Sequence, residues 1–270
     1  MPYYRFPEAA VKVAAEMNRY RIWRDSPAGE VTSFDADQGS ARRLIESKSA
    51  SGGGYLAPDD VNAVLRAYGF PVCKAVTVAA DGHLSAAGNE VGYPLVLKAA
   101  GEKIVHKSDI GGVIVGIGSE SELHTARTEM DKNLKAAGAF DDLSGYFVQE
   151  MAKPGKEVIL GVAQDPKFGP LLMFGMGGKY VEILRDVSFR VMPVTDVDAR
   201  EMVRAIKSYP LLEGVRGETG VDIDFIVESI QRLAQLVDEI DGIEELDMNP
   251  VIVAPERGDC RVVDARIRVR

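Results

Sequence analysis

Acidic side chains and an amide recur near the end of the sequence in an arrangement that could bind a cation. They alternate along two predicted strands: Glu245, Asp247 and Asn249 in IEELDMNP, then Asp264, Arg266 and Arg268 in VVDARIRVR. Alternate residues of a strand point to one face, so pairing of these strands would bring two carboxylates and an amide together. Hard oxygen ligands of this kind suit Mg²⁺, which is usually completed by waters and substrate phosphates. A solvated sheet face whose arginines balance its acids explains the same residues, and the pattern alone does not choose.

A lysine inside an apolar strand is the second candidate. Lys98 lies in PLVLKAA, where burial of its ammonium group is costly unless it meets an anion. The alternative is a lysine whose stem packs while its charged head reaches water. Lys107, nine residues later, has no such constraint and is expected to be solvated.

The segment KIVHKSDIGGV places a histidine and an acid just before a Gly-Gly pair. His106 is the candidate nucleophile, because an imidazole nitrogen can accept a phosphoryl group or a proton near neutral pH. Asp109 could fix its tautomer. The alternative is a loop histidine bonded to the backbone. His83 and His124 are expected to have no catalytic role.

The segment FGMGGKYVEILRDVSFR could fold over phosphates through the backbone N–H groups of its glycines, Gly175, Gly177 and Gly178. The signal is weak, since neither GxGxxG nor the P-loop pattern is present. Arg185 and Arg190, further along, could neutralise phosphate oxygens or face solvent.

The composition is that of an ordinary folded protein. The 270 residues are 46% hydrophobic and carry a net charge of −9, which argues against nucleic acid and anionic membranes as partners. No apolar run is long enough to cross a membrane, and the charged start predicts no secretory signal, so a cytoplasmic protein is expected. Cys73 and Cys260 are isolated and are expected in the core.

The elements that must position these residues form three predicted parts. Residues 1–54 are expected to be an amphipathic helix followed by a flexible linker that ends in SASGGG. Residues 55–145 alternate helices and strands and form a first lobe. Residues 146–270 are richer in consecutive strands and form a second lobe, so the fold class is α+β.

Six segments, in the same order, resemble the ATP-grasp domain of the nucleoside-diphosphate-forming acyl-CoA synthetases, the family that contains ADP-forming acetyl-CoA synthetase and is related to succinyl-CoA synthetase. The resemblance runs from about Leu56 to Arg268. It is carried by VHKSDIGGV, GYPLVLKA, YFVQEMAKPGKEVILGV, GGKYVEILRDVSFR, ELDMNPVIV and VDARIRV. It implies an ATP-grasp fold, with ATP or ADP in a cleft between two lobes and a helical extension before them.

The resemblance also implies residue roles. Lys98 would contact phosphates, Glu150 and Met151 would meet the adenine through hinge backbone groups, and Glu157 would reach the ribose. The remaining nucleotide-binding residues would be Gly177, Gly178 and Arg266, and the Mg²⁺ ligands would be Asp247, Asn249 and Asp264. His106 would carry phosphate, whereas Glu182 and Asp109 receive no role.

By this resemblance the chain would be the nucleotide-binding subunit or domain of an acid–thiol ligase. Phosphate would pass between His106 and ADP or ATP while acyl-CoA, ADP and phosphate become carboxylate, CoA and ATP. The CoA-binding and CoA-ligase portion would lie on a partner subunit or a missing segment, giving a hetero-oligomer. Two alternatives stay open: an ATP-grasp carboxylate–amine ligase, which needs no phosphohistidine, and a noncatalytic nucleotide-binding regulatory module. Acyl specificity and the choice between ADP and GDP are not predicted.

Overall fold

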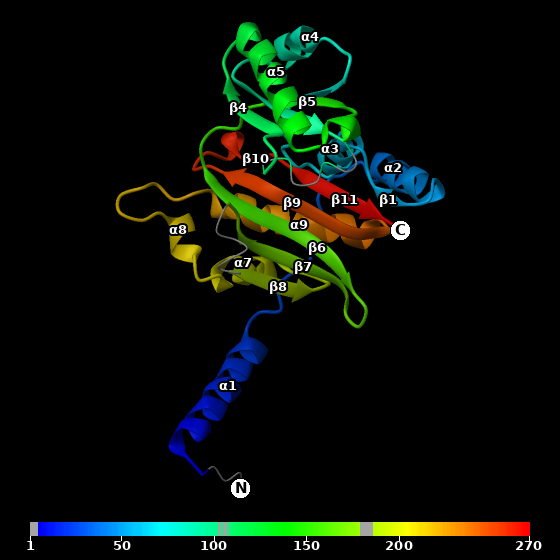
Figure 1. Ribbon diagram of the computed structural model, residues 1–270. Helices are drawn as coiled ribbons and strands as arrows, with labels where there is room; N and C mark the ends of the chain where they lie inside the picture. Colours follow the sequence, from blue (N-terminus) through cyan, green and yellow to red (C-terminus); the bar gives the residue numbers. More distant parts are fainter. Residues whose placement is uncertain (1–4, 102–103, 105–106, 108, 179–185) are drawn as a thin grey trace.

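Two antiparallel sheets, each with its own helices and core, form the body of the protein (Figure 1). The computed structural model describes residues 5–101, 104, 107, 109–178 and 186–270. The smaller sheet has the order β2-β5-β3-β4, and the larger one has the order β1-β11-β9-β6-β7-β8, with β10 paired to β9. The predicted α+β class and the two lobes are therefore confirmed.

The first lobe consists of the four-stranded sheet and two helices packed on one of its faces. Apolar side chains alternate along the central strands, so Leu97 and Val148 enter a core closed by the helices. Gly111, with a φ of +68°, lies in a turn before β4, which begins at Val113. The elements are β2 (Ala75–Ala79), α4 (Leu84–Val91), β3 (Leu95–Ala100), β4 (Val113–Ile117), α5 (Glu120–Ala136), a 3₁₀ turn (Phe140–Asp142) and β5 (Gly145–Glu150).

The second lobe consists of the larger sheet, with helices covering one face of it (Figure 1). The long amphipathic helix α9 lies along this face and buries ten residues. The elements are α2 (Gln38–Ala50), β1 (Gly54–Tyr55), α3 (Pro58–Ala67), β6 (Lys156–Asp165), β7 (Gly169–Met176), β8 (Val187–Val191), α7 (Asp196–Ala205), α8 (Tyr209–Glu213), α9 (Ile223–Glu239), β9 (Ile243–Val253), a 3₁₀ turn (Arg257–Asp259), β10 (Arg261–Val262) and β11 (Ala265–Val269).

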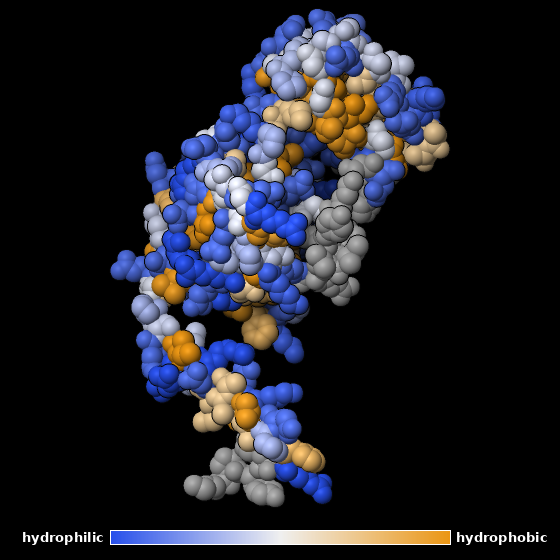
Figure 2. Space-filling model, turned by 90° about the vertical axis from the view of Figure 1, so that its left-hand side faces the viewer, coloured by the Kyte–Doolittle hydropathy of each residue, from blue (hydrophilic) through white to orange (hydrophobic). Residues whose placement is uncertain are grey.

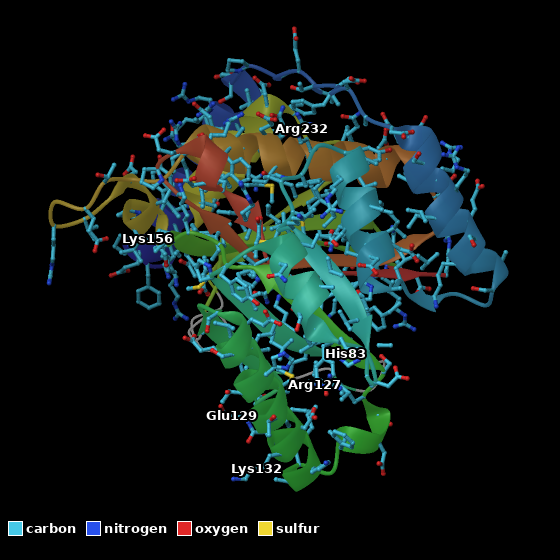
Figure 3. The ribbon with its side chains drawn as sticks, turned by 90° about the horizontal axis from the view of Figure 1, so that it is seen from above. His83, Arg127, Glu129, Lys132, Lys156 and Arg232 are labelled. Atoms are coloured by element: carbon cyan, nitrogen blue, oxygen red, sulfur yellow. The ribbon has the colours of Figure 1, made fainter. Side chains whose placement is uncertain are left out.

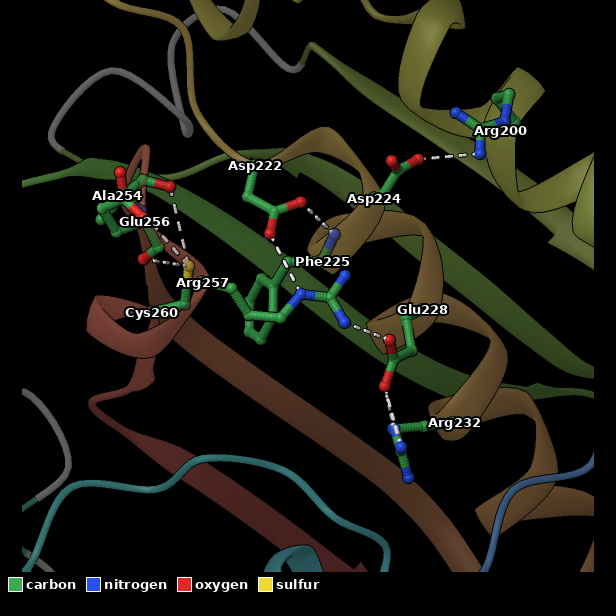
Figure 4. A network of polar contacts seen from close by, with 10 residues as sticks. All are labelled: Arg200, Asp222, Asp224, Phe225, Glu228, Arg232, Ala254, Glu256, Arg257 and Cys260. Atoms are coloured by element: carbon green, nitrogen blue, oxygen red, sulfur yellow. Dashed lines mark hydrogen bonds and ion pairs between the residues drawn. The ribbon is translucent and has the colours of Figure 1, made fainter.

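The 3₁₀ turn before β10 is fixed to helix α9 by a charged network (Figure 4). The Arg257 guanidinium donates to Asp222 at 3.0 Å and to Glu228 at 2.5 Å. Cys260, fully buried beside this turn, accepts from the backbone N–H of Ala254 at 3.4 Å. These contacts fix the position from which the last two strands of the chain join the larger sheet. The expectation that both cysteines lie in the core is confirmed.

The predicted boundaries at residues 54 and 145 do not follow the two cores. Helices α2 and α3 and strand β1 pack with the larger sheet, although they precede the first lobe in sequence. Strand β5, on the other hand, is a central strand of the smaller sheet. The reason is that β1 pairs with β11, the last strand of the chain, and this long-range pairing leaves no local sequence signal.

The predicted flexible linker is largely ordered against the second lobe. Residues 26–37, which we call the N-terminal strap, are held by side chains of α7 and α9. Asp196 accepts from the backbone N–H of Glu30 at 2.8 Å, and the Gln235 amide both accepts from and donates to the backbone of Phe34. The strap is polar, so it is fixed by hydrogen bonds instead of apolar burial.

Helix α1 (Pro7–Asp25) projects from the body beyond this strap (Figure 1). All of its residues are described and none is buried, so the predicted amphipathic face packs on nothing within the chain. Among the described residues, no helix is long and apolar enough to cross a membrane.

The burial of α2 is testable with a matched pair of isoleucines. Ile45 in α2 is 1% exposed, whereas Ile22 in α1 is 54% exposed. We expect Ile45→Ala to lower the free energy of unfolding by about 2–5 kcal/mol in urea denaturation, because it opens a cavity in the core. Ile22→Ala should change it by less than about 0.5 kcal/mol in the isolated chain. Equal, small effects of the two substitutions would mean that α2 behaves as a linker.

Candidate functional site

A buried lysine of the first lobe reaches across to a backbone carbonyl of the second. Lys98, on β3, is 6% exposed, and its Nζ donates to the carbonyl oxygen of Val263 at 2.9 Å. Gln149, on the neighbouring strand β5, donates its Nε2 to the same oxygen at 2.9 Å. Both side chains point away from the first core because Leu97 and Val148, next to them in sequence, point into it. One carbonyl of the second lobe therefore receives two buried donors from the first.

The ammonium of Lys98 is poorly solvated, which contradicts the alternative of a charged head reaching water. Burial lowers its pKa, the nearby Asp264 carboxylate opposes this, and the charge of Lys107 lowers the pKa further. Lys107 was expected to be solvated, but it is only partly exposed and its charge acts on Lys98. A site with two cations and little water favours an anionic ligand.

The last strands pair as the alternation of their side chains predicts. Arg266 of β11 lies opposite Asp247 of β9. Just beyond the ladder, the backbone N–H of Asn249 donates to the carbonyl oxygen of Asp264 at 3.0 Å. The two aspartates and the asparagine are thus brought onto neighbouring strand segments, next to the carbonyl of Val263 that Lys98 contacts.

Asp247 lies in an unusual electrostatic environment. Burial raises the pKa of its carboxyl group to about 6; Arg266 opposes the shift, and the charges of Glu245 and Asp264 add to it. Gly161, opposite Asp247 on β6, leaves space beside the carboxylate, because a Cβ there would lie 3.7 Å from Oδ1. The carboxylates therefore repel one another in a partly desolvated position, an arrangement that a bound cation would relieve.

The chemistry of these donors fits Mg²⁺. Asp247, Asn249 and Asp264 offer hard oxygen ligands beside a buried lysine. Within the described part of the chain, no group of three or more His, Cys, Asp or Glu side chains could hold a metal ion by itself. The protein therefore supplies a partial ligand set of the kind that an anionic substrate completes.

The start of the glycine-rich segment lies over Glu157. The backbone N–H of Gly177 donates to the Glu157 carbonyl oxygen at 2.7 Å, and a Cβ at position 178 would lie 3.0 Å from Glu157 Oε2. Gly178 has a φ of +84°, a conformation that favours glycine. The structure thus brings together Glu157, Gly177 and Gly178, which lie about twenty residues apart in sequence.

The predicted hinge lies where β5 leaves the first lobe. The side chain of Glu150 accepts from Arg261 Nε at 3.3 Å, and Met151 is partly exposed. A pocket of about 600 Å³ opens beside this junction, with the charged side chains Arg66, Lys74, Glu90, Glu150 and Arg261 in its lining. Glu150 is the only predicted site residue among its lining residues, so this pocket lies at the hinge and not at Lys98 and Asp264.

His106, Glu182 and Arg185 lie outside the described residues. The described flanks of the histidine segment nevertheless start and end beside Lys98, since the carbonyl of Gly112 accepts from the N–H of Ala99 at 2.8 Å. His83 lies near Arg127 on the helical side of the first lobe (Figure 3). His124 contacts Ser85 and Glu120, so it belongs to the surface of that side.

Sequence reasoning missed three parts of this site. Gln149 directly precedes Glu150, a predicted hinge residue. The alternation of side chains along this strand was the sequence signal that could have identified Gln149. Gly161 could be recognised only from its register opposite Asp247. The carbonyl of Val263 leaves no sequence signal, because every residue has a carbonyl.

Comparisons with known proteins show which family and which relatives the chain resembles. A sequence model of the family described as ATP-grasp domain matches residues 47–269. The chain is 40% identical over 267 residues to a protein named 4-hydroxybutyrate--CoA ligase [ADP-forming] from Nitrosopumilus maritimus, covering 99% of this chain and 38% of that protein. It is also 40% identical to the beta subunit of acetate--CoA ligase [ADP-forming] II from Pyrococcus furiosus, covering 85% of this chain and 98% of that subunit. The chain thus spans less than half of one relative and nearly all of the other.

A solved structure is similar as well. It is an acetyl-coenzyme A synthetase 1 of Ca. Korarchaeum cryptofilum in complex with coenzyme A and Mg-AMPPCP, 39% identical, with a TM-score of 0.72. The match covers 85% of this chain and all of that chain. Its description places a phosphohistidine segment pointing towards the nucleotide binding site.

The raised pKa of Asp247 gives a pH-dependent prediction. The folded-state pKa of about 6 exceeds the unfolded value near 4, so ionising this carboxyl group costs stability as pH rises from about 4 to 6, and the full cost is present above 6. We expect Asp247→Asn to raise the free energy of unfolding at pH 7.5 by about 1–3 kcal/mol in the unliganded chain, and by roughly half as much at pH 5. Denaturant unfolding at both pH values measures this. Glu129→Gln, at an exposed position of α5 in the other lobe, is the control; an equal gain there would contradict the role of burial.

Proposed function

This chain belongs to the ATP-grasp family, and on that premise we propose that it is the nucleotide-binding portion of an ADP-forming acyl-CoA synthetase. The reaction converts acyl-CoA, ADP and phosphate into carboxylate, CoA and ATP, or runs in reverse. Relatives named as 4-hydroxybutyrate and acetate ligases support this acid–thiol ligase activity. The proposal specifies no acyl group, because the names of the relatives give different acyl substrates.

One observation carries the proposal: Lys98 is buried between the lobes with its ammonium directed at Val263, next to Asp264. A buried cation beside clustered carboxylates is costly unless further charges balance both. The phosphates of ADP or ATP would pair with Lys98, and a magnesium ion would pair with the carboxylates. The nucleotide would therefore bind in the cleft between the lobes.

The residues around this point receive roles accordingly. Asp247, Asn249 and Asp264 would hold Mg²⁺, which when bound supplies positive charge to phosphate oxygens. Arg266, opposite Asp247 in the sheet, would add a cation at the same face. Lys98 would orient the phosphates, so that positioning and charge neutralisation are the main contributions of the protein.

The base and the sugar would lie toward the hinge. Glu150 and Met151 would meet the adenine through backbone groups, and the exposed Glu157 carboxylate would reach the ribose hydroxyls. Gly177 and Gly178, which lie over Glu157, would begin a backbone cover for the phosphates. No side chain of this set distinguishes ADP from GDP.

His106 would carry the phosphoryl group. Its segment leaves and rejoins the first lobe beside Lys98, and the K. cryptofilum description of a phosphohistidine segment pointing towards the nucleotide site supports this role. An imidazole nitrogen would attack the γ-phosphorus of ATP, ADP would leave, and the phosphoryl group would remain on the ring.

A second portion is needed to complete the reaction. This chain spans 38% of the N. maritimus ligase, so we propose that CoA binding and acyl transfer reside on a partner chain or on another segment of a longer one. A hetero-oligomer follows if the partner is separate. The cytoplasmic location stays a prediction.

The phosphohistidine role is tested by labelling. We expect the chain, incubated with Mg²⁺ and ATP labelled at the γ-phosphate, to acquire an acid-labile and base-stable label, because phosphoramidates hydrolyse in acid. The label should be lost in His106→Ala and retained in His124→Ala, the control. Label retained in His106→Ala, or absent from the wild type both alone and with its CoA-ligase portion, would contradict the role. Full ligase activity in His106→Ala would instead favour a carboxylate–amine ligase.

Gln149 offers a test of the contact between the lobes. Its Oε1 is buried with no hydrogen-bond partner among the residues that the structure describes, while its Nε2 donates to the carbonyl of Val263. We expect Gln149→Met to keep stability within about 1 kcal/mol, since the lost bond is offset by removal of the unpaired oxygen. We expect it to weaken Mg-ADP binding about five- to tenfold in calorimetry, because Asp264 is then positioned less well relative to Lys98.

The matched control is Gln164→Met, which removes the same kind of bond, from Gln164 Nε2 to the carbonyl of Ile243 at 3.1 Å, elsewhere in the second lobe. It should leave Mg-ADP affinity unchanged. If both variants bind Mg-ADP like the wild type, Gln149 does not position the site.

A further inference from the structure

Helix α1 exposes an unusual amount of apolar surface. Val13, Met17 and Tyr20 recur at the spacing of one helical face, and Phe6 at the N-cap continues the same line, whereas the exposed Val11 and Ile22 lie on the opposite side. Met17 is 69% exposed and Tyr20 is 60% exposed. Figure 2 shows apolar residues on the surface of this projecting segment. A helix that leaves its large apolar side chains exposed, with no residue buried, indicates a missing partner.

The base of this helix is held in a fixed position. The N-terminal strap is bonded to the second lobe at three points: Gln231 Nε2 donates to Thr32 at 2.6 Å, the Arg232 guanidinium lies 4.3 Å from the Phe34 ring centroid, and Asp196 accepts from Glu30. Figure 3 shows Arg232 on helix α9, at the end of the molecule where the strap passes. The apolar face is therefore presented from a defined point of the second lobe.

A hollow of about 460 Å³ marks where α1 meets the body. It is lined by Tyr20, Ile22 and Trp23 of α1 and by Glu201 of α7, and the Tyr20 and Trp23 rings lie 5.5 Å apart. Aromatic side chains with a polar edge are typical of protein interfaces. Tyr20 belongs both to this hollow and to the apolar face, and the charged side chains of Glu16 and Arg19 also line the hollow.

The comparisons indicate what covers this face. The ATP-grasp match begins at residue 47, so α1 lies outside the family domain. The N. maritimus ligase matches 99% of this chain and therefore shares α1, and that protein is much longer than this chain. The P. furiosus beta subunit is matched over 98% of its length by only 85% of this chain, so it is too short to hold all of it. Of these two relatives, the one that shares helix α1 is therefore the one whose chain also contains additional protein.

We propose that α1 is a docking helix for the CoA-binding and ligase portion of the synthetase, which would receive its apolar face in a groove with an acidic rim. This inference rests on the proposed function. Residues 5–25 carry five basic and three acidic side chains in a chain of net charge −9. That local positive charge favours acidic neighbours and opposes pairing with a second α1.

The test uses two matched substitutions on opposite faces of the helix in the complete two-portion synthetase. Met17→Asp places a charge on the apolar face, and Ala15→Asp places the same charge on the far side. We expect Met17→Asp to raise the concentration of CoA-ligase portion needed for half-maximal acyl-CoA synthesis at least 50-fold. Ala15→Asp should stay within twofold of the wild type. Equal values for Met17→Asp and the wild type would overturn the proposal.

Two further measurements separate the possible outcomes. The isolated chain should bind Mg-ADP with the same affinity in the wild type and in Met17→Asp. If the wild type does not bind Mg-ADP at all, the proposed function is contradicted and the docking proposal is not. Backbone amides of residues 7–25 should exchange with deuterium at least tenfold more slowly in the synthetase than in the isolated chain. Equal exchange, or protection in the isolated chain with a dimeric mass in light scattering, would overturn docking to the ligase portion.

Discussion

The buried ammonium of Lys98 is the constraint from which the arrangement of the site follows. An ammonium removed from water must be compensated by acceptors or anions at close range. Here the carbonyl of Val263 and the charge of Asp264 provide compensation from the opposite lobe. The two sheets therefore have to meet at this point, and the link between β10 and β11 that holds Val263 and Asp264 has to lie there. The Arg257 network and the pairing of β9 with β11 fix that link.

The compensation is incomplete, and this is what makes the site suited to a ligand. Lys98 has a lowered pKa, Asp247 has a raised pKa, and the buried amide oxygen of Gln149 has no partner in the described part of the chain. A folded chain seldom retains three such costs in one place unless the site has a function. A nucleotide bearing phosphates and a metal ion would pair with the lysine and the carboxylates together.

The second lobe also anchors the start of the chain. Its core takes in α2 and α3 before the first lobe begins, and its surface holds the N-terminal strap. The lobe that carries Asp247, Asn249 and Asp264 is thus the same one that fixes α1. A partner docked on α1 would therefore be tied to the lobe that bears Asp247 and Asp264.

The sequence by itself determined the local features. Strand alternation placed Asp247 and Arg266 on one face, the apolar context of Lys98 predicted a charge in need of a partner, and six ordered motifs indicated the ATP-grasp fold. These signals are local, because side-chain period and neighbouring residues determine them. Only the tertiary structure decided that β1 pairs with β11, that a polar strap is held by α7 and α9, and that Gln149 and Lys98 share one carbonyl. Such contacts join residues more than one hundred positions apart through backbone groups, which every residue carries and no sequence pattern distinguishes.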